Sequence, residues 1–162
     1  MSDVNLENMT PEQIAEYQKK NCIFCHIINN RIPSYKVYED DKVLAILDIN
    51  PIHPGHILLL PKEHYYLLSQ IPDKLIRYLF VVAKYLSSAM IKTLGAGGVN
   101  IFVANGAGAG QKAPHFMIHL IPRFEDDGLE IFKLPGYKID ENVLKQLADV
   151  LKKLLAKEGK HE

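Results

Sequence analysis

Two histidines stand close together in the segment His115-Phe-Met-Ile-His119, with Met117 between them. Alternate residues of a strand share a face, so these three side chains are expected on one side of it and Phe116 and Ile118 in the core. Imidazoles carry out acid–base chemistry, bind metals and make ordinary surface hydrogen bonds. The strand by itself therefore leaves the role of the two histidines open.

A glycine-rich segment, Asn105-Gly-Ala-Gly-Ala-Gly-Gln111, precedes this strand. Such a loop lets backbone N–H groups approach an anion. Its spacing matches neither the P-loop nor the dinucleotide-binding fingerprint, and a strand rather than a helix follows it. Taken alone, the segment favours an ordinary surface loop over a phosphate site.

The only two cysteines form the pair Cys22-Ile-Phe-Cys25, which is too close in sequence for an ordinary structural disulfide. Zinc takes four nitrogen or sulfur ligands in a tetrahedron, and this pair supplies two of them. With His161 set aside because it lies in the C-terminal tail, the histidines available for the others are His26, His53, His56, His64, His115 and His119. Spacing does not choose among them. A thioredoxin-type redox pair is the alternative, but a polar segment precedes the cysteines where that motif needs a buried strand.

Composition limits the class of protein in which these residues act. The length of 162 residues predicts one domain, with room for an appendage. Basic and acidic residues number 19 each, so the overall basic excess of a typical nucleic-acid binder is missing. The first residues do not resemble a secretory signal, and no apolar run reaches the roughly 18 residues of a membrane span. We therefore expect a cytoplasmic protein without a membrane partner.

Periodicity and turn residues predict the elements that must position these side chains. Thr10-Pro11 and Gln13 indicate a capped helix that runs to about Lys19. Further helices are predicted at 23–28, 74–94 and 140–158, and strands at 35–38, 43–49, 56–60, 99–103 and 115–121. This order indicates an α+β fold with an antiparallel sheet.

Several motifs together closely resemble the histidine-triad (HIT) family, in particular its zinc-bearing members with Cys-x-x-Cys. The matching segments are Cys22-Ile-Phe-Cys25, Ile32-Pro33, Val37-Tyr-Glu-Asp40, Asp48-Ile49, Pro54-Gly-His56, Pro61-Lys-Glu-His64, Gly110-Gln111 and His119-Leu-Ile-Pro-Arg123. The resemblance implies a homodimer with a HIT-like fold: about five antiparallel strands and a long helix. Around that domain, at 21–135, we expect an N-terminal helical extension at 1–20 and a C-terminal helix at 136–162.

The resemblance also implies a ligand and a reaction. Members of the family bind purine nucleotides and cleave phosphoramidates, nucleoside polyphosphates or nucleotide esters. The middle histidine of His-x-His-x-His attacks the α-phosphate and divides one difficult displacement into two easier ones. Carried over to this chain, the nucleotide-binding residues are Ile23, Phe24, Ile27, Ile46, Asp48, Ile49, Asn105, Gln111 and Lys112. Asp48 would hold the ribose, whereas His56 and the third triad histidine, His119, would lie at the phosphate.

In the zinc-bearing members, the metal takes the cysteine pair, the histidine of Pro-Lys-x-His and the first triad histidine. The corresponding residues here are Cys22, Cys25, His64 and His115. Four protein ligands fill a tetrahedral site, so the resemblance implies structural rather than catalytic zinc.

This chain departs from the family pattern where the chemistry takes place. Met117 occupies the position of the nucleophile, and a thioether cannot carry a proton as imidazole does. Lys112 stands where serine or threonine is usual, and Ala104 occupies the position of the phosphate-side asparagine, with Asn105 beside it. We therefore expect a purine nucleotide or related phosphate to be bound by a pseudoenzyme with impaired catalysis.

Three other functions are weighed against this one. A hydrolase with a rerouted mechanism would use His119, His56 or Lys112. A zinc-stabilised dimeric interaction module would have a vestigial pocket. Nucleic-acid binding is not favoured, because acidic residues interleave the lysines of the C-terminal helix.

Overall fold

The structure is a computed structural model that describes residues 9–129, 136 and 138–158. The chain separates into two units, residues 1–127 and 128–162, and each is described by itself. The predicted domain boundary near residue 135 lies outside the described residues.

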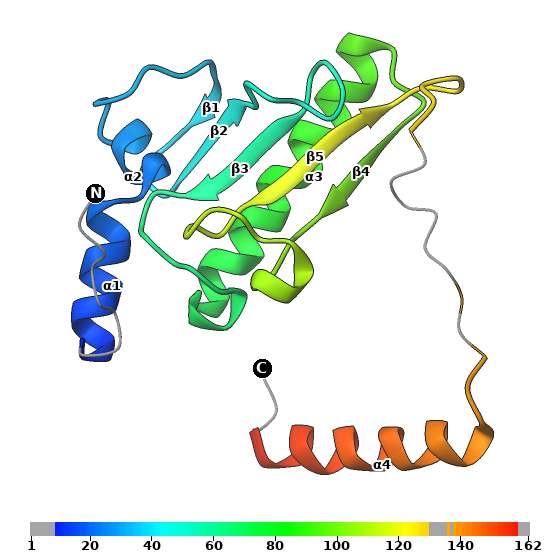
Figure 1. The fold of residues 1–162 in the computed structure, drawn as a ribbon. Helices are drawn as coiled ribbons and strands as arrows, with labels where there is room; N and C mark the ends of the chain where they lie inside the picture. The colour runs from blue at the N-terminus through cyan, green and yellow to red at the C-terminus, as the bar shows by residue number, and fades with distance from the viewer. Residues whose placement is uncertain (1–8, 130–135, 137, 159–162) are drawn as a thin grey trace. The chain divides into compact units, whose positions relative to one another are not determined.

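Unit 1 is built on a five-stranded sheet in which every neighbouring pair is antiparallel, and this confirms the predicted α+β class (Figure 1). The strand order is β1-β2-β3-β5-β4. The strands are β1 (Lys36–Glu39), β2 (Val43–Leu47), β3 (Ile57–Pro61), β4 (Gly98–Phe102) and β5 (Ile118–Arg123). The order places β5 between β3 and β4, so strands that are far apart in the sequence become neighbours.

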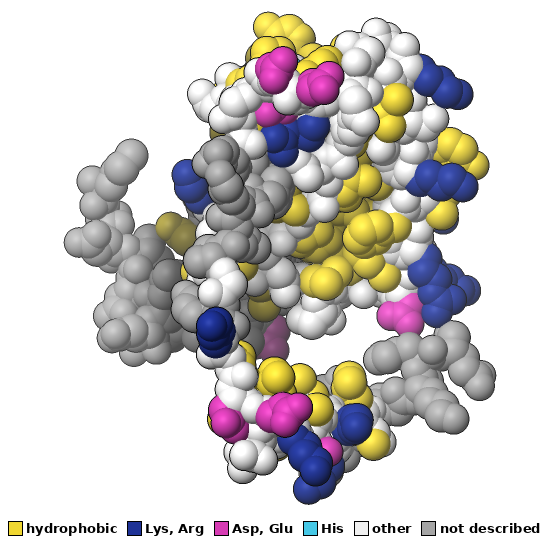
Figure 2. Space-filling view, turned by 90° about the vertical axis from the view of Figure 1, so that its right-hand side faces the viewer, with side chains coloured by type: hydrophobic (Ala, Val, Ile, Leu, Met, Phe, Trp, Pro, Cys, Tyr) yellow, Lys and Arg dark blue, Asp and Glu magenta, His cyan; other side chains and the backbone are white. Residues whose placement is uncertain are grey.

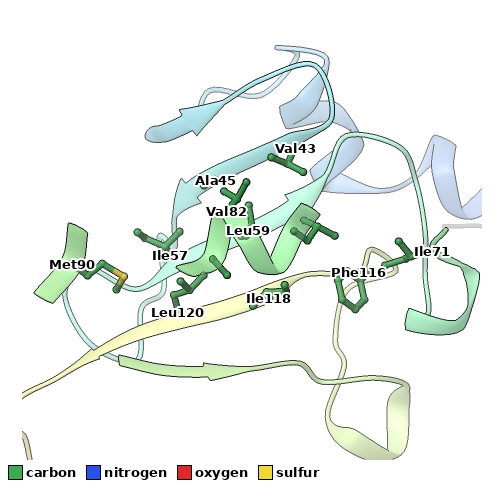
Figure 3. Close-up of a cluster of buried hydrophobic side chains, with 12 residues drawn as sticks. Val43, Ala45, Ile57, Leu59, Ile71, Val82, Met90, Phe116, Ile118 and Leu120 are labelled. Carbon is green, nitrogen blue, oxygen red and sulfur yellow. The ribbon is translucent and has the colours of Figure 1, made fainter. Parts of the chain in front are cut away.

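The long helix α3 (Asp73–Leu94) covers one face of the sheet and contacts β3, β4 and β5. Between them lies the larger core cluster, the α3-side core (Figure 3), which contains Val43, Ala45, Ile57, Leu59, Val82, Phe116, Ile118 and Leu120. Gly95 ends the helix in the left-handed conformation, with φ of 68°. A left-handed glycine at this position is a common helix terminator.

The short helix α2 (Ile23–Ile28) covers the opposite face and forms a second core cluster with β2 and β3. The members of this cluster, the α2-side core, are Ile27, Leu44, Ile46, Leu58 and Leu60. Successive residues of β3 therefore enter different clusters, as the two-residue period of a strand requires. Burial on both faces explains why β2 and β3 are almost entirely apolar in sequence.

The boundaries predicted for the fifth strand are wrong at both ends. His115 and Met117 precede the first ladder residue, Ile118, although Phe116 and Ile118 face the core as expected. The strand also continues through Pro122, which pairs with Val99. The ladder with β3 ends at Leu120, so Pro122 has β4 on one side only and its missing N–H leaves no gap in the ladder.

The remaining elements agree with the sequence within a few residues. Helix α1 (Pro11–Lys20) has the predicted capping box, in which the Thr10 hydroxyl accepts from Gln13 N at 3.3 Å and Thr10 N donates to Gln13 Oε1 at 2.8 Å. Short 3₁₀ turns span Leu68–Gln70 and Ala107–Ala109. In unit 2, α4 (Glu141–Glu158) exposes apolar side chains beside charged ones (Figure 2), among them Leu147, Leu151 and Leu154.

Gly55 generates the first prediction, because it has φ of +93° and lies immediately before His56. A Cβ at this position would lie 2.9 Å from Leu94 Cδ1 and 3.3 Å from Pro122 Cγ. We expect Gly55→Ala to lower the free energy of unfolding by about 1–3 kcal/mol, through backbone strain and this contact. Gly98→Ala is the matched control, because its Cβ would meet nothing within 4 Å. Urea unfolding measures both, and equal effects would contradict the packing argument.

Candidate functional site

Two cysteines and two histidines converge at one end of β3. Cys22 and Cys25 come from the start of α2, His64 follows β3, and His115 precedes β5. One ligand atom from each residue lies within 4.8 Å of all the others. Cys25 Sγ is 3.2 Å from His64 Nδ1, and Cys22 Sγ is 3.5 Å from His115 Nδ1. These residues, three of them buried, form a possible metal site with two sulfur and two nitrogen donors.

The surroundings of the cluster suit a bound cation. His115 Nε2 lies 2.9 Å from Pro61 O, which can only accept, so Nε2 carries the proton and the Nδ1 lone pair faces the cysteines. Burial lowers the pKa of His115 to about 4. Burial and the adjacent Cys22 thiol raise the pKa of Cys25 to about 12. A bound divalent ion would lower the pKa of this thiol and stabilise its ionised form.

A second group of side chains lines a pocket of about 370 Å³ on the same side of the sheet as α2. The predicted residues among its lining are Phe24, Asp48, His56, Gln111, Lys112, Met117 and His119. An apolar pocket of about 230 Å³ shares Phe24, Asp48 and Leu58 with it. Its lining includes Ile23, Ile27, Ile46 and Ile49. The two pockets therefore adjoin each other, and a carboxylate lies among the residues that they share.

The histidines of the pocket are hydrogen-bonded to each other. His56 Nε2 lies 3.1 Å from His119 Nδ1, and His56 Nδ1 lies 3.3 Å from Asp48 Oδ2. Phe102 stacks on His119 with ring centroids 4.5 Å apart and planes 6° apart. Burial lowers the pKa of both histidines, and that of His119, also lowered by His56, is about 4. Both rings are therefore neutral near pH 7 in this structure.

In the sequence, Met117 lies between His115 of the cysteine–histidine cluster and His119 of the pocket. Its side chain lines the pocket and packs against the α2-side core. Its thioether is a weak acceptor without a proton to give. A flexible methionine fills an irregular gap well, so the packing alone accounts for this side chain.

The glycine-rich segment is held by hydrogen bonds within it and to neighbouring backbone groups. Gln111 Oε1 accepts from Gly106 N at 2.7 Å, and Gln111 Nε2 donates to Tyr66 O at 2.9 Å and Ala113 O at 3.1 Å. The backbone N–H groups of Ala109 and Gly110 also donate within the segment. A phosphate in the pocket would therefore depend on side chains more than on these N–H groups.

The structure places Asn105 away from the pocket lining. Its amide oxygen accepts from Leu68 N at 2.9 Å, and the neighbouring Ala104 faces the pocket. Sequence reasoning missed Phe102, the ring beneath His119. The alternation of β4 offered a signal, because Val99 and Val103 pack in the α3-side core and Phe102 therefore faces the other side.

The family is decided by comparison with known proteins. The sequence profile of the HIT domain matches residues 29–126, well over half of the chain. The chain belongs to the HIT family. An uncharacterized HIT-like protein of Borreliella burgdorferi is 53% identical over 110 residues, which cover 67% of this chain and 79% of that protein.

Two HIT relatives carry names that state an activity. Adenosine 5'-monophosphoramidase HNT1 of Saccharomyces cerevisiae is 39% identical over 138 residues, 84% of this chain and 82% of that protein. Adenylylsulfatase HINT3 of Arabidopsis thaliana is 40% identical over 126 residues, 76% of this chain and 64% of that protein.

Solved structures share the HIT fold. SMU.412c from Streptococcus mutans superposes with a TM-score of 0.78 at 37% identity, over 83% of this chain and 85% of that one. A histidine triad nucleotide-binding protein from Candida albicans gives 0.74 at 35% identity, over 86% and 100%. A zinc-bound histidine triad protein from Mycobacterium smegmatis gives 0.66 at 31% identity, over 76% and 85%.

Within the part of the chain that the structure describes, none of the helices combines the length and the apolarity needed to cross a membrane.

The brace made by Gln111 generates the second prediction. Gln111→Ala removes three hydrogen bonds that hold the loop before β5, so we expect a loss of about 1–3 kcal/mol in unfolding free energy. The adjacent Lys112→Ala is the control, because that side chain is exposed, and its effect should stay within about 0.5 kcal/mol. Urea unfolding compares the two variants. Equal stability would show that the amide does not brace the loop.

Proposed function

We propose that this HIT protein binds a purine nucleotide, or a related nucleoside phosphate, and that Met117 severely impairs its covalent catalysis. The observation that carries the proposal is the pair of adjoining pockets that share Asp48. An apolar slot suits a flat base, and a carboxylate suits the two ribose hydroxyls. The histidine-lined end then lies where a 5'-phosphate would be.

The charges of the phosphate end support an anionic ligand. Within the described lining, Lys112 is the one side chain with a permanent positive charge. His56 uses its Nε2 in the contact with His119 Nδ1, so His119 Nε2 is the ring nitrogen left to face a phosphate oxygen. Lysine acts on phosphate as a point charge on a flexible stem, so Lys112 can follow oxygens that the rigid imidazoles do not reach.

The loss of catalysis follows from the side chain at 117. A nucleotidyl-histidine forms when an imidazole nitrogen attacks phosphorus and the leaving group departs, and a proton must be managed at each stage. Met117 can neither accept nor return that proton. Removal of the nucleophile from an acting unit lowers turnover by several orders of magnitude.

We also propose that the four-residue cluster holds Zn²⁺ in a structural role. Two thiolates and two imidazole nitrogens complete a tetrahedron and leave no position for substrate water. The bond from His115 to Pro61 O supplies the second-shell support typical of a zinc histidine. Bound zinc would tie α2, the segment after β3 and the segment before β5 together.

Metal analysis tests the zinc proposal. We expect about one zinc per chain in protein purified without chelator, and much less in Cys25→Ser. A strong chelator should lower the Tm of the wild-type protein, because metal binding is coupled to folding. His53→Ala is the control, since His53 stacks on Phe124 outside the cluster. Structural zinc would be excluded if the purified wild-type protein contained no metal and its Tm did not change with the chelator.

Calorimetric titration with AMP tests the binding proposal. We expect AMP to bind the wild-type protein and Met117→His alike. Asp48→Ala should weaken binding by about 10- to 100-fold, through loss of charge-assisted hydrogen bonds. Asp41→Ala is a matched control, because Asp41 lines a different pocket.

A turnover assay on adenosine phosphoramidate tests the proposed impairment. Met117→His should cleave it at least about a thousandfold faster than the wild-type protein. Rapid turnover by the wild-type protein would instead establish a rerouted mechanism. Failure of AMP to bind either form would refute the proposed function and favour an interaction module.

A further inference from the structure

The two residues between the cysteines of the cysteine–histidine cluster are also residues of the apolar pocket. Ile23 and Phe24 both line that pocket, and Phe24 lines the adjoining histidine pocket as well. Cys22 and Cys25, on either side of them in the chain, each have a sulfur close to a histidine nitrogen of the cluster. One stretch of four residues therefore contributes two donors to the possible metal site and two side chains to the wall of the pocket.

Phe24 also meets the cluster across space. Its ring centroid lies 6.1 Å from that of His115, with the two planes inclined at 58°. His115 is completely buried, and its Nδ1 lies 3.5 Å from Cys22 Sγ. The phenyl ring is therefore linked to the cluster both through the backbone and through a packed neighbour.

The two ends of α2 are held in different ways. At the C-terminal end, Asn29 Nδ2 donates to Cys25 O at 2.7 Å, and Ile27 is buried in the α2-side core. At the N-terminal end, the cap residue Cys22 makes no side-chain hydrogen bond to the helix, and its thiol belongs to the cluster instead. The first turn, which carries the two pocket residues, therefore lacks a cap that would hold it independently of the cysteines.

The length of α2 makes such an anchor important. The helix has six residues, and isolated helices shorter than about 12 residues are marginal in water. Without a metal, the two thiols make only weak hydrogen bonds to the histidines, because sulfur is a weak donor and a weak acceptor. Two thiolates that share one ion would instead fix both ends of the first turn.

We propose that Cys22 and Cys25 are positioning residues for the nucleotide site, and that metal binding by this pair and nucleotide binding in the apolar pocket strengthen each other. The inference rests on the proposed function for its ligand class and its metal. A metal-bound pair holds Ile23 and Phe24 in place, so less conformational entropy is lost when a base packs against them. A bound base in turn holds the first turn of α2, and with it the spacing of the two cysteines.

Thermodynamic linkage determines the form of this coupling. If the metal raises the affinity for AMP by some factor, AMP must raise the affinity for the metal by the same factor. We expect a factor of about 5 to 150 for Zn²⁺ and AMP, the usual range for coupled sites. Ribose 5-phosphate is the ligand control. It has no base to pack against Ile23 and Phe24, so its affinity should hardly change with the metal.

Two titrations of the whole chain measure the factor independently. Calorimetry gives the affinities for AMP and for ribose 5-phosphate in zinc-loaded and in chelator-treated protein. Competition with a chromophoric chelator gives the affinity for Zn²⁺ with and without saturating AMP. We expect the two factors for AMP to agree and to exceed about fivefold. An affinity for AMP that is the same with and without the metal would overturn the inference and leave the proposed function standing.

Two variants of α2 separate local coupling from a general effect on stability. Phe24→Ala keeps all four donors but removes the ring that joins the cluster to the pocket, so zinc should still bind while the factor falls sharply. Ile28→Ala is the matched control, because Ile28 packs against the α2-side core and lines neither pocket. It should lower stability and keep the wild-type factor. A wild-type factor in Phe24→Ala would overturn the inference.

Hydrogen exchange of the wild-type protein gives a measurement that does not depend on any variant. The N–H of His26 donates to Cys22 O at 3.1 Å in the first turn of α2, whereas β3 is paired with a strand on each side. Removal of zinc should speed exchange at His26 and leave the amides of β3 protected. AMP added to the metal-free protein should restore part of the protection at His26. Equal loss of protection in α2 and β3 would indicate general unfolding and overturn the inference.

The remaining outcomes separate the inference from the proposals beneath it. Zinc-loaded protein that does not bind AMP would overturn the proposed nucleotide function itself. Protein that binds AMP but no Zn²⁺ would overturn the inference together with the structural zinc, and would leave nucleotide binding standing.

Discussion

Burial of β3 on both faces is the constraint on which the rest of unit 1 depends. Leu59 enters the α3-side core and Leu58 enters the α2-side core, so the strand fixes both layers at once. The ends of the same strand define the two sites. His56 precedes it and lines the pocket, whereas the carbonyl of Pro61 at its other end contacts His115 of the possible metal site. A displacement of β3 would therefore disturb the pocket and the cysteine–histidine cluster together.

Much of this arrangement could be predicted from the sequence because the signals are local. The capping box at Thr10 and the apolar runs of β2 and β3 each depend on a few consecutive residues. The end of β5 could not be predicted in this way. Whether Pro122 stops a strand depends on whether a neighbour needs its N–H, and that neighbour, β3, is about sixty residues away in the sequence.

The candidate site also has a part that could be predicted from the sequence and a part that could not. Spacing alone does not choose among the histidines for the possible metal site. The family resemblance implies its four residues, and the structure brings all four together. The pairing of His56 with His119 and the bonding of Asn105 to Leu68 depend on how distant loops meet. Residue types therefore indicate which groups can act, but only the fold shows which nitrogen of His119 is left for a ligand. The homodimer implied by the family resemblance stays a prediction.

The strand order has a consequence for the kinetics of folding. Strands β1, β2 and β3 follow one another as hairpins, and β4 and β5 form another, but the joint between β3 and β5 closes a loop of some sixty residues. Contacts of such long range form slowly, because the chain between them must lose conformational entropy before the contacts stabilise the fold. Both clusters span this joint, since His56 meets His119 across it and Cys22 meets His115. The four-residue cluster and the pocket are therefore complete only when the second hairpin docks, which requires the chain as far as His115 for the first and His119 for the second.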